Sequence, residues 1–266
     1  MTVAEQTTSV DGTPIAFDRV GDGPPLIIVG GAWNTRHSGA ELAERLADSF
    51  AVHTYDRRGR GDSGDTPPYA VEREIEDLQA VIAAAGGSAA LFGHSSGGAL
   101  ALETTARSLS VTKLAVYEAP YIVDSSRPPL AADYIEHLEE LMAAGKRREV
   151  VSYFMTEAVG MPPEMVEQMI ESPMVEAMEP VPHTVSYDGR VMLRGSMHGE
   201  PLPAEWRDSV TVPTLVMSGG NSPEWLRNTC TALVRLLPDV AYRTLEGQDH
   251  AASPEALAPV LEDFLR

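Results

Sequence analysis

The sequence predicts an α/β protein with a mostly parallel, eight-stranded sheet, helices on both faces and an inserted helical segment. Short apolar runs bounded by turn residues alternate with helical patterns along most of the 266 residues. This alternation stops between residues 121 and 205, where only helical patterns occur. Apolar residues make up 43% and charged residues 22%, which is typical of a soluble globular chain with a sizeable core.

The strand predictions begin with a hairpin. Residues 3–9 and 13–20 flank Asp11-Gly12, a pair that favours a tight turn between antiparallel strands. Residues 26–29 form a continuous apolar run that ends at Gly30-Gly31, as expected of a strand buried on both faces. Five further strands are predicted over 52–55, 89–92, 114–117, 214–217 and 241–245.

Apolar residues at helical spacing predict helices between these strands. They cover residues 40–50, 71–85, 96–107, 223–237 and 254–264. In the interruption, helices are expected over 134–144, 147–158 and 163–171. We therefore predict a core of residues 1–120 and 206–266, with a helical cap of residues 121–205 inserted after the sixth strand.

The predicted cap is rich in methionine. Nine of the eleven methionines fall in it, and methionine adapts to irregular apolar space. We interpret the segment as a lid with a pliable apolar underside, and the alternative is a Met-rich helical core that contacts no ligand.

Residues 93–97, with the sequence Gly-His-Ser-Ser-Gly, lie between a predicted buried strand and a predicted helix. A sharp turn from strand to helix needs small residues beside the serine, because a Cβ there collides with neighbouring chain. The turn places the Ser95 hydroxyl at the carboxyl end of the sheet, beside a helix N-terminus that favours developing negative charge. Ser95 is therefore the predicted nucleophile.

With this motif the sequence resembles the α/β-hydrolase fold family over nearly its whole length. The resemblance is carried by four features in the family's order: the strand ending at Gly30-Gly31, the DRRGRGDS turn of residues 56–63, the Ser95 motif, and residues 247–250. It implies a cap after the strand 114–117 and a serine hydrolase that needs no cofactor. Ser95 requires a base, and His250 occupies the place of the family's histidine. His94 is expected to pack beneath the Ser95 turn.

The acid that orients the histidine departs from the usual pattern. The family commonly has an aspartate after the strand 214–217, where this sequence has Ser222, and a hydroxyl cannot stabilise an imidazolium as a carboxylate does. Glu118 ends the preceding strand, and a buried glutamate there is unfavourable unless it is paired. Some branches of the family, such as the zearalenone-type lactone hydrolases, draw their acid from this strand. We predict Glu118 as the acid, and the open alternatives are Asp249, Asp124 and a dyad without an acid.

An oxyanion hole requires two backbone N–H groups directed at the developing charge. The resemblance assigns them to Ser96, directly after the nucleophile, and to Ala32, directly after Gly31. Trp33 is expected to line the acyl pocket, with ordinary core packing as the alternative. The predicted substrate contacts are Gly31, Trp33, Met155 and Tyr187.

Charge and composition exclude several other classes. Acidic residues outnumber basic ones 39 to 20, so nucleic acid and anionic membrane surfaces are poor partners. Cys230 is the single cysteine, which excludes an internal disulfide and a cysteine-based zinc cluster, and we expect no metal or other cofactor. Without a secretory pattern or a long apolar stretch, a cytoplasmic location is expected. The three arginines of the 56–63 turn, Arg57, Arg58 and Arg60, are expected to pair with surface acids.

These observations predict a serine hydrolase that cleaves a small apolar ester or lactone, with a homodimer left open. One alternative keeps the scaffold and changes the reaction to C–C bond hydrolysis, perhydrolysis, or a cyclase or lyase step. The other is a receptor that binds a small molecule without turnover, which the serine at position 222 favours.

Overall fold

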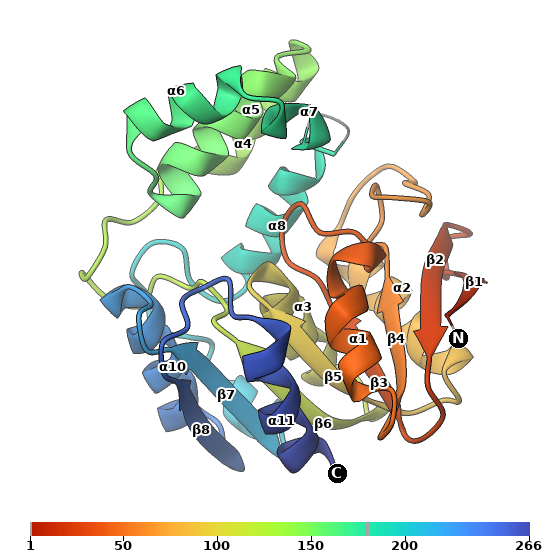
Figure 1. The fold of residues 1–266 in the computed structure, drawn as a ribbon. Coiled ribbons are helices and arrows are strands. Elements are labelled where there is room, and N and C mark those ends of the chain that lie inside the picture. Colours follow the sequence, from red (N-terminus) through yellow and green to blue (C-terminus); the bar gives the residue numbers. More distant parts are fainter. Residues whose placement is uncertain (1, 179–180) are drawn as a thin grey trace.

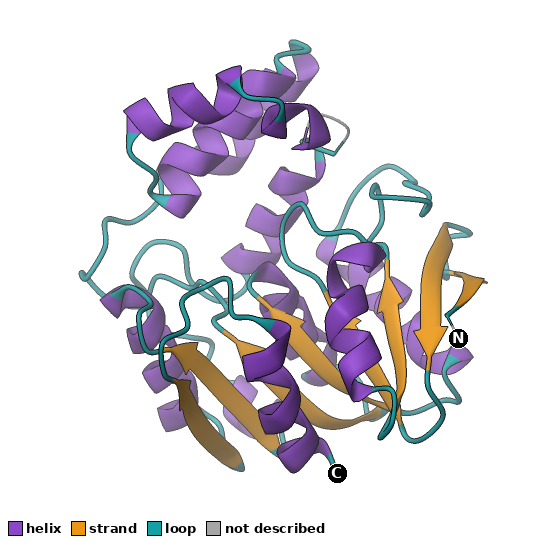
Figure 2. Ribbon diagram, in the orientation of Figure 1, coloured by secondary structure: helices purple, strands orange, loops and turns teal. Residues whose placement is uncertain are grey.

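The computed structural model describes residues 2–178 and 181–266, and these form one mixed sheet covered by helices (Figures 1 and 2). Its spatial order is β1-β2-β4-β3-β5-β6-β7-β8. The β1/β2 and β2/β4 pairs are antiparallel, and the remaining five pairs are parallel. The predicted mostly parallel, eight-stranded sheet is therefore confirmed. The strands are β1 (Val3–Thr8), β2 (Pro14–Val20), β3 (Pro25–Val29), β4 (Ala51–Tyr55), β5 (Ala89–His94), β6 (Val111–Tyr117), β7 (Thr214–Gly219) and β8 (Val240–Leu245).

Helices cover both faces of the sheet. A short 3₁₀-helix, η1 (Arg36–Gly39), precedes α1 (Ala40–Leu46), and α1 packs with α11 (Pro254–Leu265) on one face. On the other face lie α2 (Val71–Ala84), α3 (Ser96–Thr105) and α10 (Glu224–Leu236), and α9 (Trp206–Ser209) precedes β7. Each covering helix turns an apolar side to the sheet, and each fully buried large apolar side chain contributes about 1.5–3 kcal/mol. Two apolar clusters, one on each face, form the core.

A helical insertion joins β6 to β7. It contains α4 (Tyr134–Ala143), α5 (Arg147–Tyr153), the π-helix η2 (Phe154–Val159), α6 (Pro163–Glu171), α7 (Met174–Met178) and α8 (Thr184–Leu193). In Figure 1, α4 to α7 lie above the sheet, and α8 runs from them down toward α3. The helices expected over 134–144 and 163–171 are present, and the one expected over 147–158 continues from α5 into η2.

Two helices of the insertion, α7 and α8, were not expected from the sequence. Helix α8 lacks a regular apolar stripe because polar residues occupy much of its buried side. No helix in the described ranges has the length and apolar character needed to cross a bilayer. Cys230 on α10 is fully buried, and burial raises the pKa of its thiol to about 12.

Candidate active site

Ser95 lies at the sharp turn between β5 and α3. Its φ of 57° and ψ of −131° are unusual for a residue with a side chain. The turn depends on glycines, because a Cβ on Gly97 would lie 2.1 Å from the Val29 carbonyl oxygen and one on Gly93 would lie 2.5 Å from the Gly97 carbonyl oxygen. The Ser95 amide donates to the Tyr117 carbonyl at 3.0 Å, which ties the turn to β6. The local sequence therefore fixes the serine at the carboxyl edge of the sheet.

Ser95, His250 and Glu118 form a continuous hydrogen-bonded series. The distance between Ser95 Oγ and His250 Nε2 is 3.1 Å, and that between His250 Nδ1 and Glu118 Oε2 is 2.8 Å. The second carboxylate oxygen accepts the Gly219 N–H at 2.8 Å. A histidine that donates from Nδ1 to a carboxylate leaves Nε2 free to accept the serine proton. The arrangement is that of an activated nucleophile.

Glu118 is completely buried at the end of β6. Burial alone disfavours its charged form, but the hydrogen bonds from His250 and the Gly219 N–H outweigh burial and hold the pKa of Glu118 below its ordinary value. The Ser222 side chain, also buried, occupies the loop after β7 where the family commonly has its aspartate. Glu118 is therefore charged at neutral pH, and a carboxylate in this position has the charge needed to stabilise an imidazolium at His250.

The two other carboxylates considered from the sequence do not contact the histidine ring in the described structure. Asp249 is exposed, and its carboxylate accepts the Ala251 amide at 2.9 Å. Asp124 is exposed on the surface, where it accepts the Ser126 amide at 2.9 Å. Of the acids weighed, Glu118 has the geometry to orient His250.

His94 supports the histidine loop from below the nucleophile. Its Nε2 lies 2.8 Å from the His250 carbonyl oxygen, and the two rings pack with centroids 4.9 Å apart. Burial, together with the nearby His250, lowers the pKa of His94 to about 4. The ring is therefore neutral near pH 7 and donates from Nε2 to the carbonyl.

We expect His94 to make the protein less stable in mild acid. Between about pH 6.5 and pH 4 the unfolded chain binds a proton at His94 that the folded chain excludes, so the free energy of unfolding falls as the pH falls. Thermal melts of the parent and of His94→Gln across this range test the expectation, and the variant should show the shallower pH dependence. The exposed His37, replaced by Asn, is the control for loss of an imidazole. Equal slopes in the parent and His94→Gln would contradict the expectation.

Backbone strain is concentrated at this site. In the described part of the chain, the non-glycine residues with positive φ are Trp33 at 65°, Ser95 at 57° and Glu118 at 47°. Ser95 and Glu118 are the predicted nucleophile and acid, and Trp33 directly follows Ala32 of the predicted oxyanion hole. Such conformations cost about 1–3 kcal/mol each and persist where the surrounding structure enforces them.

Two residues that adjoin Ser95 in the cavity have backbone amides without a protein acceptor among the described residues. Ala32 and Ser96 line the same cavity as Ser95 and His250. Within residues 2–178 and 181–266, neither the Ala32 N–H nor the Ser96 N–H has a protein acceptor. Both amides are therefore available to bind an oxyanion on a substrate attacked by Ser95.

The cavity next to Ser95 has a volume of about 710 Å³. Its lining is mostly apolar and comes from the sheet edge and the helical insertion together. Met161, Met192 and Met197 contribute to it, which agrees with the expected apolar underside of the insertion. Such a cavity suits a small molecule with substantial apolar surface.

The structure places the four predicted substrate contacts around the cavity rather than in its lining. Gly31 adjoins Ser95, since a Cβ on this glycine would lie 2.9 Å from that of Ser95. Trp33 packs edge-on against Phe154, a lining residue, with ring centroids 5.7 Å apart. Met155 follows Phe154 in η2. Tyr187 stacks on Tyr69, with ring centroids 3.8 Å apart.

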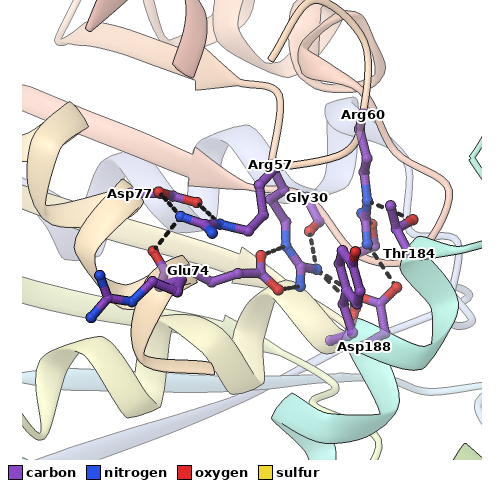
Figure 3. A network of polar contacts seen from close by, with 12 residues as sticks. Gly30, Arg57, Arg60, Glu74, Asp77, Thr184 and Asp188 are labelled. Carbon is purple, nitrogen blue, oxygen red and sulfur yellow. Dashed lines mark hydrogen bonds and ion pairs between the residues drawn. The ribbon is translucent and has the colours of Figure 1, made fainter. Parts of the chain in front are cut away.

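Sequence reasoning missed the charged residues next to the cavity. Asp188 on α8 lines it and is buried, and its carboxylate pairs with Arg57 and Arg60 (Figure 3). The expectation that the arginines of the 56–63 turn pair with surface acids is wrong, because these guanidinium groups are buried and bind Glu74, Asp77 and Asp188. The sequence around these arginines carries no local signal of their burial, because the partner Asp188 lies more than a hundred residues later in the chain. In the described residues, no group of three or more His, Cys, Asp or Glu side chains is arranged to hold a metal ion.

The chain is similar to several known proteins. The chain is 55% identical to an alpha/beta hydrolase from Sphaerobacter thermophilus, with a TM-score of 0.91 over 98% of this chain and all of that one. It is 38% identical over 121 residues to a pimeloyl-[acyl-carrier protein] methyl ester esterase of Xanthomonas campestris, which covers 44% of this chain and 46% of the relative. It is 32% identical over 111 residues to the uncharacterized hydrolase YraK of Bacillus subtilis, and this match covers 40% of this chain and 41% of the relative. The match spans less than half the length of these two curated relatives.

Two further comparisons cover most or all of this chain. A thermophilic esterase from Thermogutta terrifontis is 22% identical, with a TM-score of 0.72 over all of this chain and 98% of that one, and this likeness is one of fold. The sequence profile of the Alpha/beta hydrolase family matches residues 26–260, which include the Ser95 turn, Glu118 and His250. The chain therefore belongs to the alpha/beta hydrolase family.

Proposed function

We propose that this alpha/beta hydrolase is a serine esterase or lactonase that acts on a small apolar substrate through an acyl-enzyme. The observation that carries the proposal is the series Ser95–His250–Glu118, with donor–acceptor distances of 3.1 and 2.8 Å, beside the Ala32 and Ser96 amides, which have no acceptor among the described residues. The methyl ester esterase among the partial relatives supports ester chemistry.

The geometry supports the following sequence of steps. His250 Nε2 takes the hydroxyl proton as Ser95 Oγ attacks the ester carbonyl, and the carbonyl electron pair moves onto oxygen. The Ala32 and Ser96 amides bind this oxyanion, and Glu118 stabilises the imidazolium. Collapse breaks the bond to the alcohol, which leaves with the proton from His250.

Water completes the cycle. His250, neutral again, takes a proton from a water molecule that attacks the acyl-enzyme, and the second tetrahedral intermediate releases the carboxylic acid and restores Ser95. In a lactone the alcohol and the acid belong to one molecule, so a single hydroxy acid leaves. Glu118, directly after β6, resembles in position the acid of the zearalenone-type lactone hydrolases, and this resemblance supports testing lactones beside open-chain esters.

The helical insertion acts as a cap in this proposal. Its residues close the cavity over Ser95 and present Met161, Met192 and Met197 to the substrate. Because methionine side chains adapt their shape, we expect tolerance for acyl groups of different outline. The apolar lining favours the uncharged part of an ester.

Two measurements test the proposed function. A fluorophosphonate probe should label the protein, and peptide mass spectrometry should locate the adduct on Ser95. Across p-nitrophenyl acetate, butyrate and hexanoate, kcat/KM should rise by about two- to fourfold per methylene, since burial of a CH₂ contributes about 0.8 kcal/mol. A protein that is neither labelled nor active on any ester or lactone, yet binds small molecules tightly, would instead be a receptor.

A further inference from the structure

A buried ionic cluster lies beside the loop that carries Ala32, and it consists of Arg57, Arg60, Glu74 and Asp188 (Figure 3). Arg57 donates to both carboxylate oxygens of Glu74 at 2.6 and 2.8 Å and to Asp188 at 2.7 Å. Arg60 donates to the other oxygen of Asp188, also at 2.7 Å. The four side chains are at most 4% exposed, and two positive charges balance two negative ones. Each ion is therefore paired in spite of its burial.

Arg60 also binds the backbone next to Ala32. Its Nη1 donates to the Gly31 carbonyl oxygen at 2.6 Å, and the backbone N–H of Asn34 donates to the same oxygen at 3.3 Å. The Gly31 carbonyl and the Ala32 N–H belong to one planar peptide unit and point in opposite directions. Fixing the oxygen therefore fixes the direction in which the Ala32 N–H points.

The same cluster also binds the side chain of Ser96, the residue that carries the second amide. The Ser96 hydroxyl donates to Asp188 Oδ1 at 2.7 Å, which anchors the first residue of α3 to α8. Burial alone raises the pKa of Asp188, but the charges of Arg60 and Arg57 outweigh burial and hold that pKa below its ordinary value. Asp188 is therefore an ionised anchor that comes from the insertion.

We propose that Arg60 is a positioning residue for the oxyanion hole, and that Asp188 of the insertion holds Arg60 in place. Together they keep the Gly31–Ala32 peptide in the orientation that stabilises the tetrahedral intermediate. This inference rests on the serine hydrolase function proposed above. A guanidinium on the carbonyl also polarises the peptide and strengthens the Ala32 N–H as a donor. The insertion then contributes to the chemical step as well as covering the cavity.

Arg60→Met tests the proposal, with Arg58→Met as the matched control. Arg58 comes from the same turn, is equally buried and loses comparable ion pairs, to Asp77 at 2.7 Å and Asp11 at 3.0 Å, but it does not contact the oxyanion loop. With p-nitrophenyl butyrate below both melting temperatures, Arg60→Met should lower kcat by about 10- to 100-fold and leave KM within about twofold, because the lost interaction acts on the transition state. Arg58→Met should keep kcat within about threefold of the parent. The rate of fluorophosphonate labelling should follow kcat in both variants.

The outcomes separate the two proposals. If the parent is active and the two variants lose kcat equally, or if Arg60→Met changes only KM, the role of Arg60 is refuted while the proposed function stands. If the parent is neither active on esters nor labelled, the proposed function fails, and the role of Arg60 fails with it. Should Arg60→Met not fold, Arg60→Lys and Arg58→Lys replace the pair. A lysine amine cannot reproduce the forked contact with Gly31 and Asp188, so Arg60→Lys alone should lose kcat.

Discussion

Replacement of Ser95 by alanine should lower kcat for any ester substrate by about 10⁴- to 10⁶-fold, the range measured when a nucleophilic serine is removed. The hydroxyl 3.1 Å from His250 Nε2 is the atom that forms the acyl bond, and no neighbouring group in the series replaces it. Alanine fits the same backbone, so the melting temperature should stay within a few degrees of the parent. Initial rates with p-nitrophenyl butyrate, and fluorophosphonate labelling, measure the loss.

Ser218→Ala is the matched control for this replacement. Ser218 is a buried serine on β7, which is separated from β5 by β6, and its hydroxyl pairs with the Tyr242 hydroxyl at 2.7 Å instead of with the site. It should be labelled at the rate of the parent. Full ester turnover in Ser95→Ala would end the proposal of a covalent serine mechanism, because the reaction would then proceed without an acyl bond to this residue.

The sheet was predictable because its strands have a local signature. A parallel strand buried on both faces reads as a short apolar run, as over 26–29 and 214–217. Helix α8 had no such signature. Its buried side includes Thr184, Ser186 and Asp188, and the arginines that compensate Asp188 lie 128 and 131 positions earlier in the chain. Polar burial of this kind depends on long-range partners, which a local pattern cannot reveal.

Some residues of the candidate site also have a local sequence signature, and others do not. Ser95 was identifiable because its turn requires glycines at fixed offsets, and Glu118 because a carboxylate at a buried strand end needs a partner. Met155 and Tyr187 are not in the cavity lining, and a residue's type and its location in the insertion do not determine which side of a helix faces the cavity. The role of Arg60 was inaccessible, because it depends on the orientation of one peptide plane in another loop.

Replacement of Glu118 by glutamine should lower kcat by about 10³- to 10⁴-fold at neutral pH, as when the acid of a serine triad is replaced by its amide. Glutamine retains the size of the side chain but loses the charge that stabilises the imidazolium, and its NH₂ group competes with the Nδ1–H of His250. Because substrate does not touch this buried residue, KM should change by less than about threefold. Steady-state kinetics with p-nitrophenyl butyrate measure both quantities.

Asp249→Asn is the matched control, because it removes a carboxylate one residue from His250 by the same chemical change. Its exposed side chain caps the Ala251 amide, so kcat should stay within about threefold of the parent. An inactive Asp249→Asn beside a fully active Glu118→Gln would transfer the acid role to Asp249. Equal activity of both variants and the parent would mean that the histidine works without a carboxylate. Glu118→Asp separates the effect of the negative charge from that of side-chain length, because it keeps the carboxylate but shortens the side chain by one methylene group. Its kcat should lie between those of the parent and Glu118→Gln.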